Sequence, residues 1–171
     1  MGDVARRPTA VQADRREYLR RRFLSLGIGE LVAAVSFGVA GMYVSDRVAS
    51  GTQDEQALWL SLSPLLFVLV QGGIYWLAAR TWVKRRPMPA PIASIYRALR
   101  LLNPVLIGAV CVGVVLLRPS GSTLLVGLSA LGFAAIEYLN YFVVRLSYPL
   151  SRWAREVGQR RIPRLRQDLR G

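Results

Sequence analysis

The chain has 171 residues, of which 53% are hydrophobic, and it carries a formal net charge of +13 at pH 7. This length fits one domain, and the mean hydropathy of +0.31 is high for a soluble one. There is no His and only one Cys, so the chain lacks the common general base and any Cys cluster for a metal. We therefore expect no cofactor and no metal site.

Four long apolar segments dominate the chain. They cover residues 23–45, 57–79, 101–117 and 123–144. Glu30 in the first and Glu137 in the fourth are the only charged residues inside them. A spanning helix needs about 20 apolar residues, with a range of roughly 17–25. A soluble fold of this size could not bury all four segments, and the first is longer than the apolar region of a cleavable signal peptide. The sequence predicts an all-α polytopic membrane protein with four transmembrane helices in an antiparallel bundle.

The Lys and Arg residues lie almost entirely on one side of these segments. Of the 23 cations, only Arg47 and Arg118 lie in the first and third connections. The positive-inside rule then places both termini and the middle connection in the cytoplasm. Because the charge flanks apolar spans, it argues for a membrane surface and against nucleic-acid binding. The predicted organisation is a basic N-terminal segment (1–22), a transmembrane domain (23–145) and a basic cytoplasmic tail (146–171).

The basic flanks are expected to contact anionic lipid headgroups, each residue near the surface contributing about 1 kcal/mol of attraction. The residues expected at this depth are Arg20, Arg21, Arg22, Lys84, Arg85, Arg86, Arg145 and Arg152. Two local predictions accompany them. A short interfacial helix before the first span would carry Val11, Tyr18, Leu19 and Phe23 on one face. In the middle connection, three prolines between residues 87 and 91 predict an extended stretch before an amphipathic lead into the third span.

Polar residues inside the spans can be placed by depth, counting from the nearest basic residue at about 1.5 Å per residue. Glu30, Gln71 and Glu137 all fall about 12–13 Å deep on this count. Asn103 and Asn140 fall at a shallower level. Glu137, Asn140 and Tyr141 share one side of the fourth span. The predicted intramembrane polar cluster comprises Glu30, Gln71, Asn103, Glu137, Asn140 and Tyr141. We expect Glu137 to meet Gln71, Asn140 or Glu30 inside the bundle, because polar side chains bond across helix interfaces in lipid.

The fourth span and the tail carry a resemblance to known sequences. The stretch EYLNYFVVRLSY, followed by a basic segment ending in RLRQDL, resembles the C-terminal part of small four-span membrane proteins of unassigned function from high-GC bacteria. The matching positions are Glu137, Tyr138, Asn140, Tyr141, Arg145, Leu146, Asp168 and Leu169. In that pattern a His often follows the Arg-Leu pair, whereas this chain has Tyr148 and no His. The resemblance covers the last quarter of the chain and implies a bacterial inner membrane, but no activity.

Two functional hypotheses remain open at this point. The chain has no GxSxG, P-loop, GxGxxG or HExxH motif, so we predict that it is not an enzyme. It is then a non-enzymatic accessory or scaffold subunit that binds a membrane partner or a second copy of itself. The alternative is a small proton- or cation-coupled carrier that uses Glu30 and Glu137, because ionisable residues within spans often mark ion pathways.

Overall fold

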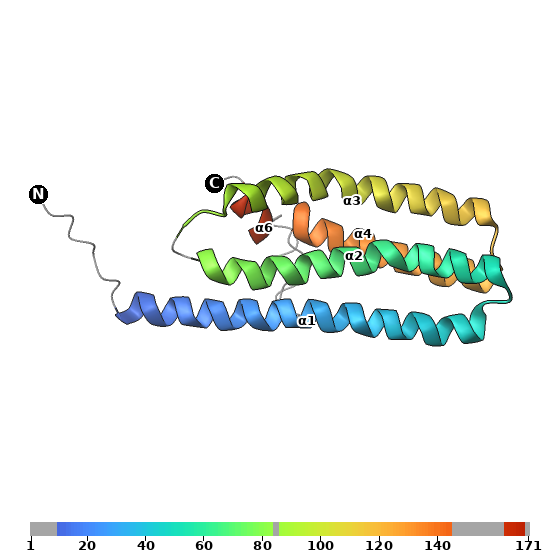
Figure 1. Cartoon of the computed structure of the whole chain (residues 1–171), viewed down its shortest axis with the longest axis horizontal. Helices are drawn as coiled ribbons and strands as arrows, with labels where there is room; N and C mark the ends of the chain where they lie inside the picture. Colours follow the sequence, from blue (N-terminus) through green and yellow to red (C-terminus); the bar gives the residue numbers. More distant parts are fainter. Residues whose placement is uncertain (1–9, 84–85, 145–162, 170–171) are drawn as a thin grey trace, which may run out of the picture.

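The computed structural model describes residues 10–83, 86–144 and 163–169, with side chains from residue 14 onward. Within these ranges the chain is all-α and has no strand. Its elements are α1 (Ala10–Val48), α2 (Thr52–Trp82), α3 (Ala90–Leu117), α4 (Gly121–Phe142) and the short α6 (Arg164–Asp168). The four long helices run antiparallel in chain order and form a bundle, with α6 at one end (Figure 1). Four of the predicted headgroup contacts, Lys84, Arg85, Arg145 and Arg152, lie outside the described residues.

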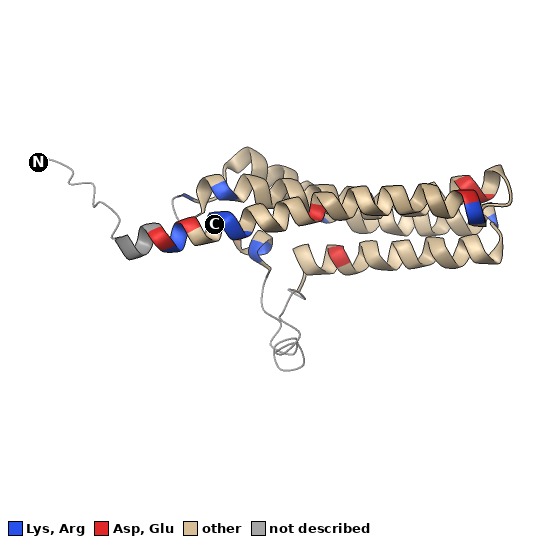
Figure 2. Cartoon of the chain, turned by 90° about the horizontal axis from the view of Figure 1, so that it is seen from below, with Lys and Arg blue, Asp and Glu red and all other residues tan. Residues whose placement is uncertain are grey.

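All four long helices are apolar and long enough to cross a membrane. Their outward-facing side chains are large and apolar: Val35 is 66% exposed, Leu116 74% and Leu125 69%. Exposure of this extent is unfavourable in water but favourable in hydrocarbon. Charged residues gather at the two ends of the bundle, and the length between them is nearly free of charge (Figure 2). We call the end where α1 begins and α2 ends the basic end, and the opposite end, with the two short connections, the loop end. The protein is therefore a four-helix, multi-pass membrane protein.

The first helix is longer than the sequence suggested. It begins at Ala10, thirteen residues before the predicted span, and extends past the other helices at the basic end (Figure 1). The predicted separate interfacial helix is wrong, because no Gly or Pro interrupts residues 10–26 and the helix continues into the span. Glu17 pairs with Arg21 at 3.2 Å and with Arg20 at 3.8 Å, which supports this extension at helical spacing. Phe23 is buried, whereas Tyr18 is 64% exposed, so these two residues do not share one buried face.

The central helix of the bundle is α2. Its apolar window is 61% buried, compared with 17% for α1 and for α3. Close approach of α1 to α2 depends on glycine: a Cβ on Gly73 would lie 2.8 Å from Cγ of Leu31 and 3.2 Å from the carbonyl oxygen of Gly27. Small residues allow this approach in lipid, where packing must replace the hydrophobic effect between helices.

Each of the two prolines inside the helices leaves one backbone carbonyl without its usual helical hydrogen bond, and a hydroxyl group donates to that carbonyl instead. A proline within a helix cannot donate to the carbonyl four residues earlier. For Pro64 in α2 that carbonyl belongs to Leu60, and the Ser63 hydroxyl donates to it at 2.8 Å. For Pro104 in α3 it belongs to Arg100, and the Tyr138 hydroxyl of α4 donates to it at 3.2 Å. The two helices therefore continue through their prolines, and the second proline adds a hydrogen bond between α3 and α4.

At the loop end, Asp54 ties the two short connections together. One carboxylate oxygen accepts from the amide of Ser50 at 2.9 Å and the other from the amide of Ser120 at 2.7 Å. Ser120 lies in the tight turn between α3 and α4, where Arg118 has a left-handed φ of 48°. One side chain on α2 thus anchors both hairpins of the bundle.

Candidate functional site

A buried polar contact between α2 and α3 is formed by a reciprocal pair of amides. Gln71 of α2 donates to Asn103 at 3.1 Å, and Asn103 of α3 donates back at 3.0 Å. Gln71 is 7% exposed and Asn103 is 0% exposed. Tyr96 adds a third bond, from its hydroxyl to the backbone carbonyl of Gln71 at 2.8 Å. The two amides satisfy each other's donors and acceptors in the interior of the bundle, and they bind α2 to α3.

This pairing corrects the predicted depths. The sequence count placed Gln71 nine residues from Arg80 but Asn103 only three residues from Arg100, and so at different levels. The two side chains in fact meet, so Arg100 lies about 9 Å further into the bundle than Arg80, at about 1.5 Å per residue. The physical reason is that α3 begins at Ala90, well before Arg100, with Pro89 and Pro91 at its N-terminus, where proline fits a helix.

We expect the amide pair to behave as one unit when it is mutated. Asn103→Leu alone should lower the free energy of unfolding by about 1–2 kcal/mol, because the Gln71 amide is left buried without its partner. Gln71→Leu should act similarly, and the double variant should be no worse than either single one. Thermal unfolding in nanodiscs compares the stability of the parent, the two single variants and the double variant. Strictly additive effects would show that the two amides are not coupled.

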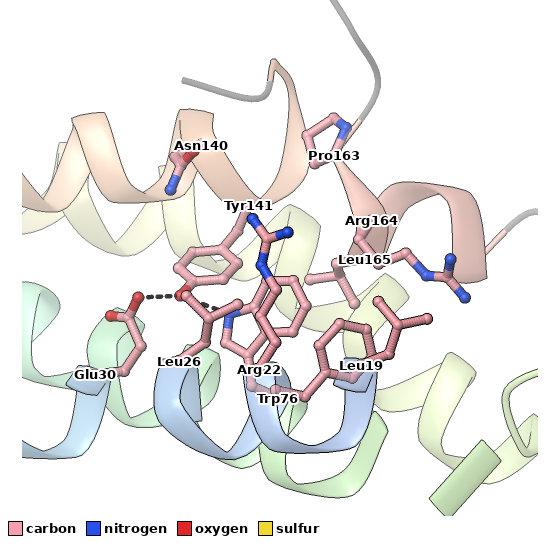
Figure 3. A pocket seen from close by; sticks show the side chains of 11 residues that line it. Leu19, Arg22, Leu26, Glu30, Trp76, Asn140, Tyr141, Pro163, Arg164 and Leu165 are labelled. Carbon is pink, nitrogen blue, oxygen red and sulfur yellow. Dashed lines mark hydrogen bonds between the residues drawn. The ribbon is translucent and has the colours of Figure 1, made fainter. Parts of the chain in front are cut away.

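A second polar group joins α1, α2 and α4. The Tyr141 hydroxyl donates to Glu30 at 2.5 Å, and the Trp76 indole donates to the Tyr141 oxygen at 3.2 Å (Figure 3). Tyr141 is 4% exposed, and its ring lies directly over Gly72, where a Cβ would be only 2.6 Å from Cζ of the ring. The glycine therefore provides the space in which the tyrosine reaches across the bundle.

The structure divides the six predicted cluster residues between two places. Gln71 and Asn103 pair between α2 and α3, while Glu30, Tyr141, Glu137 and Asn140 lie on the α1–α4 side. Glu137 is half-buried and is hydrogen-bonded by Asn140 of its own helix. Glu137 was expected to contact Gln71, Asn140 or Glu30. It is bonded to Asn140, whereas Gln71 is hydrogen-bonded to Asn103. It is Tyr141, and not Glu137, that binds Glu30.

The tail returns to the basic end and docks there through α6. Leu165 is 2% exposed and belongs to the core cluster that contains Tyr75 and Phe142. Asp168 accepts from the Tyr75 hydroxyl at 2.9 Å and from the Trp82 indole at 3.3 Å. Its other oxygen pairs with Nε of Arg164 at 3.0 Å. Sequence reasoning missed this docking, although the Arg-to-Asp spacing of four residues within RLRQD is the spacing of a helical ion pair.

A pocket of about 240 Å³ lies between these elements, and we call it the α1–α4 pocket. It is lined by Leu19, Arg22, Phe23, Leu26, Glu30, Trp76, Asn140, Tyr141, Pro163, Arg164 and Leu165. Figure 3 shows the Tyr141 side chain reaching from α4 toward Glu30 and Trp76, and the Arg22 side chain rising from α1 beside it. The pocket thus has an arginine at its outer part, a carboxyl group deeper in, and apolar walls.

The predicted headgroup contacts that the structure describes lie at the basic end. Arg20, Arg21 and Arg22 follow one another on α1, and Arg86 lies in the connection between α2 and α3. Arg21 is directed outward, with a side chain that is 80% exposed, whereas Arg22 lines the α1–α4 pocket. Among the described residues, no group of three or more acidic or Cys side chains could hold a metal ion.

The fold and its polar contacts define the class of protein: a multi-pass helical membrane protein whose four spans are joined by interhelical hydrogen bonds. No protein-family model, curated protein or solved structure matches the chain.

Proposed function

We propose that this protein is a non-enzymatic accessory or scaffold subunit of a bacterial inner membrane, oriented with the basic end in the cytoplasm. The observation that carries this proposal is the form of α1. A helix of 39 residues is about 58 Å long, whereas the hydrocarbon core is about 30 Å thick. The remainder of α1 reaches into water as a continuous helix and presents Tyr18 and arginines there, which suits contact with a partner.

The contacts within the bundle support a structural role for the buried polar residues. Gln71 and Asn103 satisfy each other, and Tyr141 uses its hydroxyl for Glu30 and its oxygen lone pair for Trp76. Toward the loop end, the described core is formed by apolar clusters that include Leu65 and Val114. A carrier needs a polar path through both halves of the membrane, and these clusters do not offer one.

One observation favours the carrier alternative. The α1–α4 pocket reaches Glu30 from the basic end, and Asn140, which also lines the pocket, is hydrogen-bonded to Glu137. Two carboxyl groups beside a pocket could exchange a proton or a cation with the cytoplasm. The route would also have to continue from Glu30 to the loop end, and the described residues there form apolar clusters.

Site-specific photo-crosslinking in native membranes tests the scaffold proposal. A photoreactive residue at position 18, on the projecting part of α1, should give a protein adduct with a partner or a second copy. The same residue at position 116, which is highly exposed on the lipid-facing side of α3, is the matched control and should give lipid adducts. If position 18 yields no protein adduct, while proteoliposomes show a cation flux that disappears in Glu137→Gln, the carrier replaces the scaffold.

A further inference from the structure

The α1–α4 pocket lies at the depth where a lipid changes from headgroup to acyl chain. Its α1 wall extends from Leu19 past Arg22 and Leu26 to Glu30. Eight residues separate Arg22 from Glu30, which is about 12 Å along the helix. Arg22 borders the basic flank, and Glu30 lies within the apolar span. A molecule that filled the pocket would therefore span the polar surface and the outer hydrocarbon of the leaflet at the basic end.

The arginines in and around the pocket differ in their ion-pair partners, and this difference points to one binding group. Arg164 is held by Asp168, and Arg20 and Arg21 are held by Glu17. Among the residues that the structure describes, Arg22 has no carboxylate within 4.0 Å. A guanidinium without a carboxylate partner, placed at a membrane surface, matches the planar two-point geometry of a phosphate group.

The rest of the lining suits a lipid better than a free anion. Leu19, Leu26 and Leu165 are apolar, and Leu26 is still 38% exposed, so the pocket leaves hydrophobic surface to be covered. A soluble phosphate would leave the leucine surface uncovered.

We propose that the α1–α4 pocket binds one anionic phospholipid from the leaflet at the basic end. Its phosphate is held by Arg22, with Arg164 as the second cation, and an acyl chain lies along Leu26 on the side of the pocket that faces the membrane interior. Two cations at one phosphate favour a lipid with a net negative charge, such as phosphatidylglycerol, over a zwitterionic lipid such as phosphatidylcholine. This site is distinct from the diffuse attraction that every arginine at the basic end exerts on the membrane surface.

Titration of the detergent-solubilised full-length protein with each lipid, followed by native mass spectrometry, tests the proposal. The parent should bind one phosphatidylglycerol molecule more tightly than phosphatidylcholine. Arg22→Gln should weaken phosphatidylglycerol about tenfold or more, because a charge-assisted hydrogen bond is lost. Arg21→Gln is the matched control: it removes the same charge from the next residue of the same helix, outside the pocket, and should leave the affinity close to that of the parent.

A second variant separates the pocket from charge alone. Leu26→Trp keeps every arginine but fills the pocket, and it should abolish the preference for phosphatidylglycerol. Leu26→Trp still tests the pocket if Arg22→Gln does not fold. Thermal melting in the same detergent shows which variants are folded. The proposal is overturned if Arg21→Gln and Arg22→Gln weaken binding equally, if Leu26→Trp binds as the parent does, or if inorganic phosphate displaces the lipid.

Discussion

Replacing Leu165 by Ala is expected to release the C-terminal helix α6 from the bundle. Leu165 is 2% exposed and packs in the core cluster at the basic end, so its truncation should lower the free energy of α6 docking by about 2–5 kcal/mol. Docking of a short helix is a local equilibrium, so a loss of this size should undock it without unfolding the four spans. Asp168 would then leave Tyr75 and Trp82 without their acceptor.

Protease accessibility of a C-terminal tag, measured beside thermal unfolding in nanodiscs, detects this release. In Leu165→Ala the tag should be removed much faster than in the parent, with a smaller change in the melting of the spans. Leu165→Met is the control, because it keeps an apolar side chain of similar volume at the same buried position. Equal protection of the tag in the parent and in Leu165→Ala would contradict the docking of α6.

Replacing Gly72 by Leu is expected to destabilise the bundle itself by about 3 kcal/mol or more. A Cβ at this position would lie 2.6 Å from both Cζ and the hydroxyl oxygen of Tyr141, and a leucine adds three further carbon atoms. Tyr141 would have to leave its place, and the hydrogen bonds from Trp76 to Tyr141 and from Tyr141 to Glu30 would be lost together. The effect should therefore exceed that of losing either hydrogen bond alone.

Gly132→Leu gives a control with the same chemical change. Gly132 lies in the middle of α4, where a Cβ would meet nothing within 4 Å. A leucine there faces lipid and replaces a weak helix former, so it should be neutral or slightly stabilising. Thermal unfolding of both variants in nanodiscs gives the comparison. If Gly72→Leu melts no lower than Gly132→Leu, then Tyr141 does not pack on Gly72.

Much of the architecture could be read from the sequence because lipid imposes simple requirements. Apolar runs of sufficient length must become helices, since unpaired backbone groups are too costly in hydrocarbon. The predicted segments at residues 57–79 and 123–144 coincide with α2 and α4 to within a few residues. The ends were less predictable, since α1 and α3 begin well before their apolar runs. Residues 10–22 and 92–100 contain no Gly or Pro, so both helices extend beyond their apolar runs.

Several polar residues that meet in the structure were named from the sequence, but their pairings and the docking of α6 were not. Asn103 and Gln71 were both recognised as polar residues within spans, yet their contact depends on how far α3 is shifted along α2. Tyr141 and Glu30 were both recognised as well, but their bond depends on the space above Gly72. The shift of α3 along α2 and the space above Gly72 both depend on how two helices pack, so the sequence of a single helix does not determine them.

The sequence by itself determined that this protein crosses a membrane four times and that carboxyl and amide groups lie within its spans. It did so because hydrophobicity, charge and helical periodicity are properties of single segments. Only the tertiary structure decided that Tyr141 rather than Glu137 binds Glu30, and that the tail docks through Leu165 and Asp168 to complete the α1–α4 pocket. Those contacts depend on the relative shift and rotation of whole helices, which are set by packing between segments far apart in the chain.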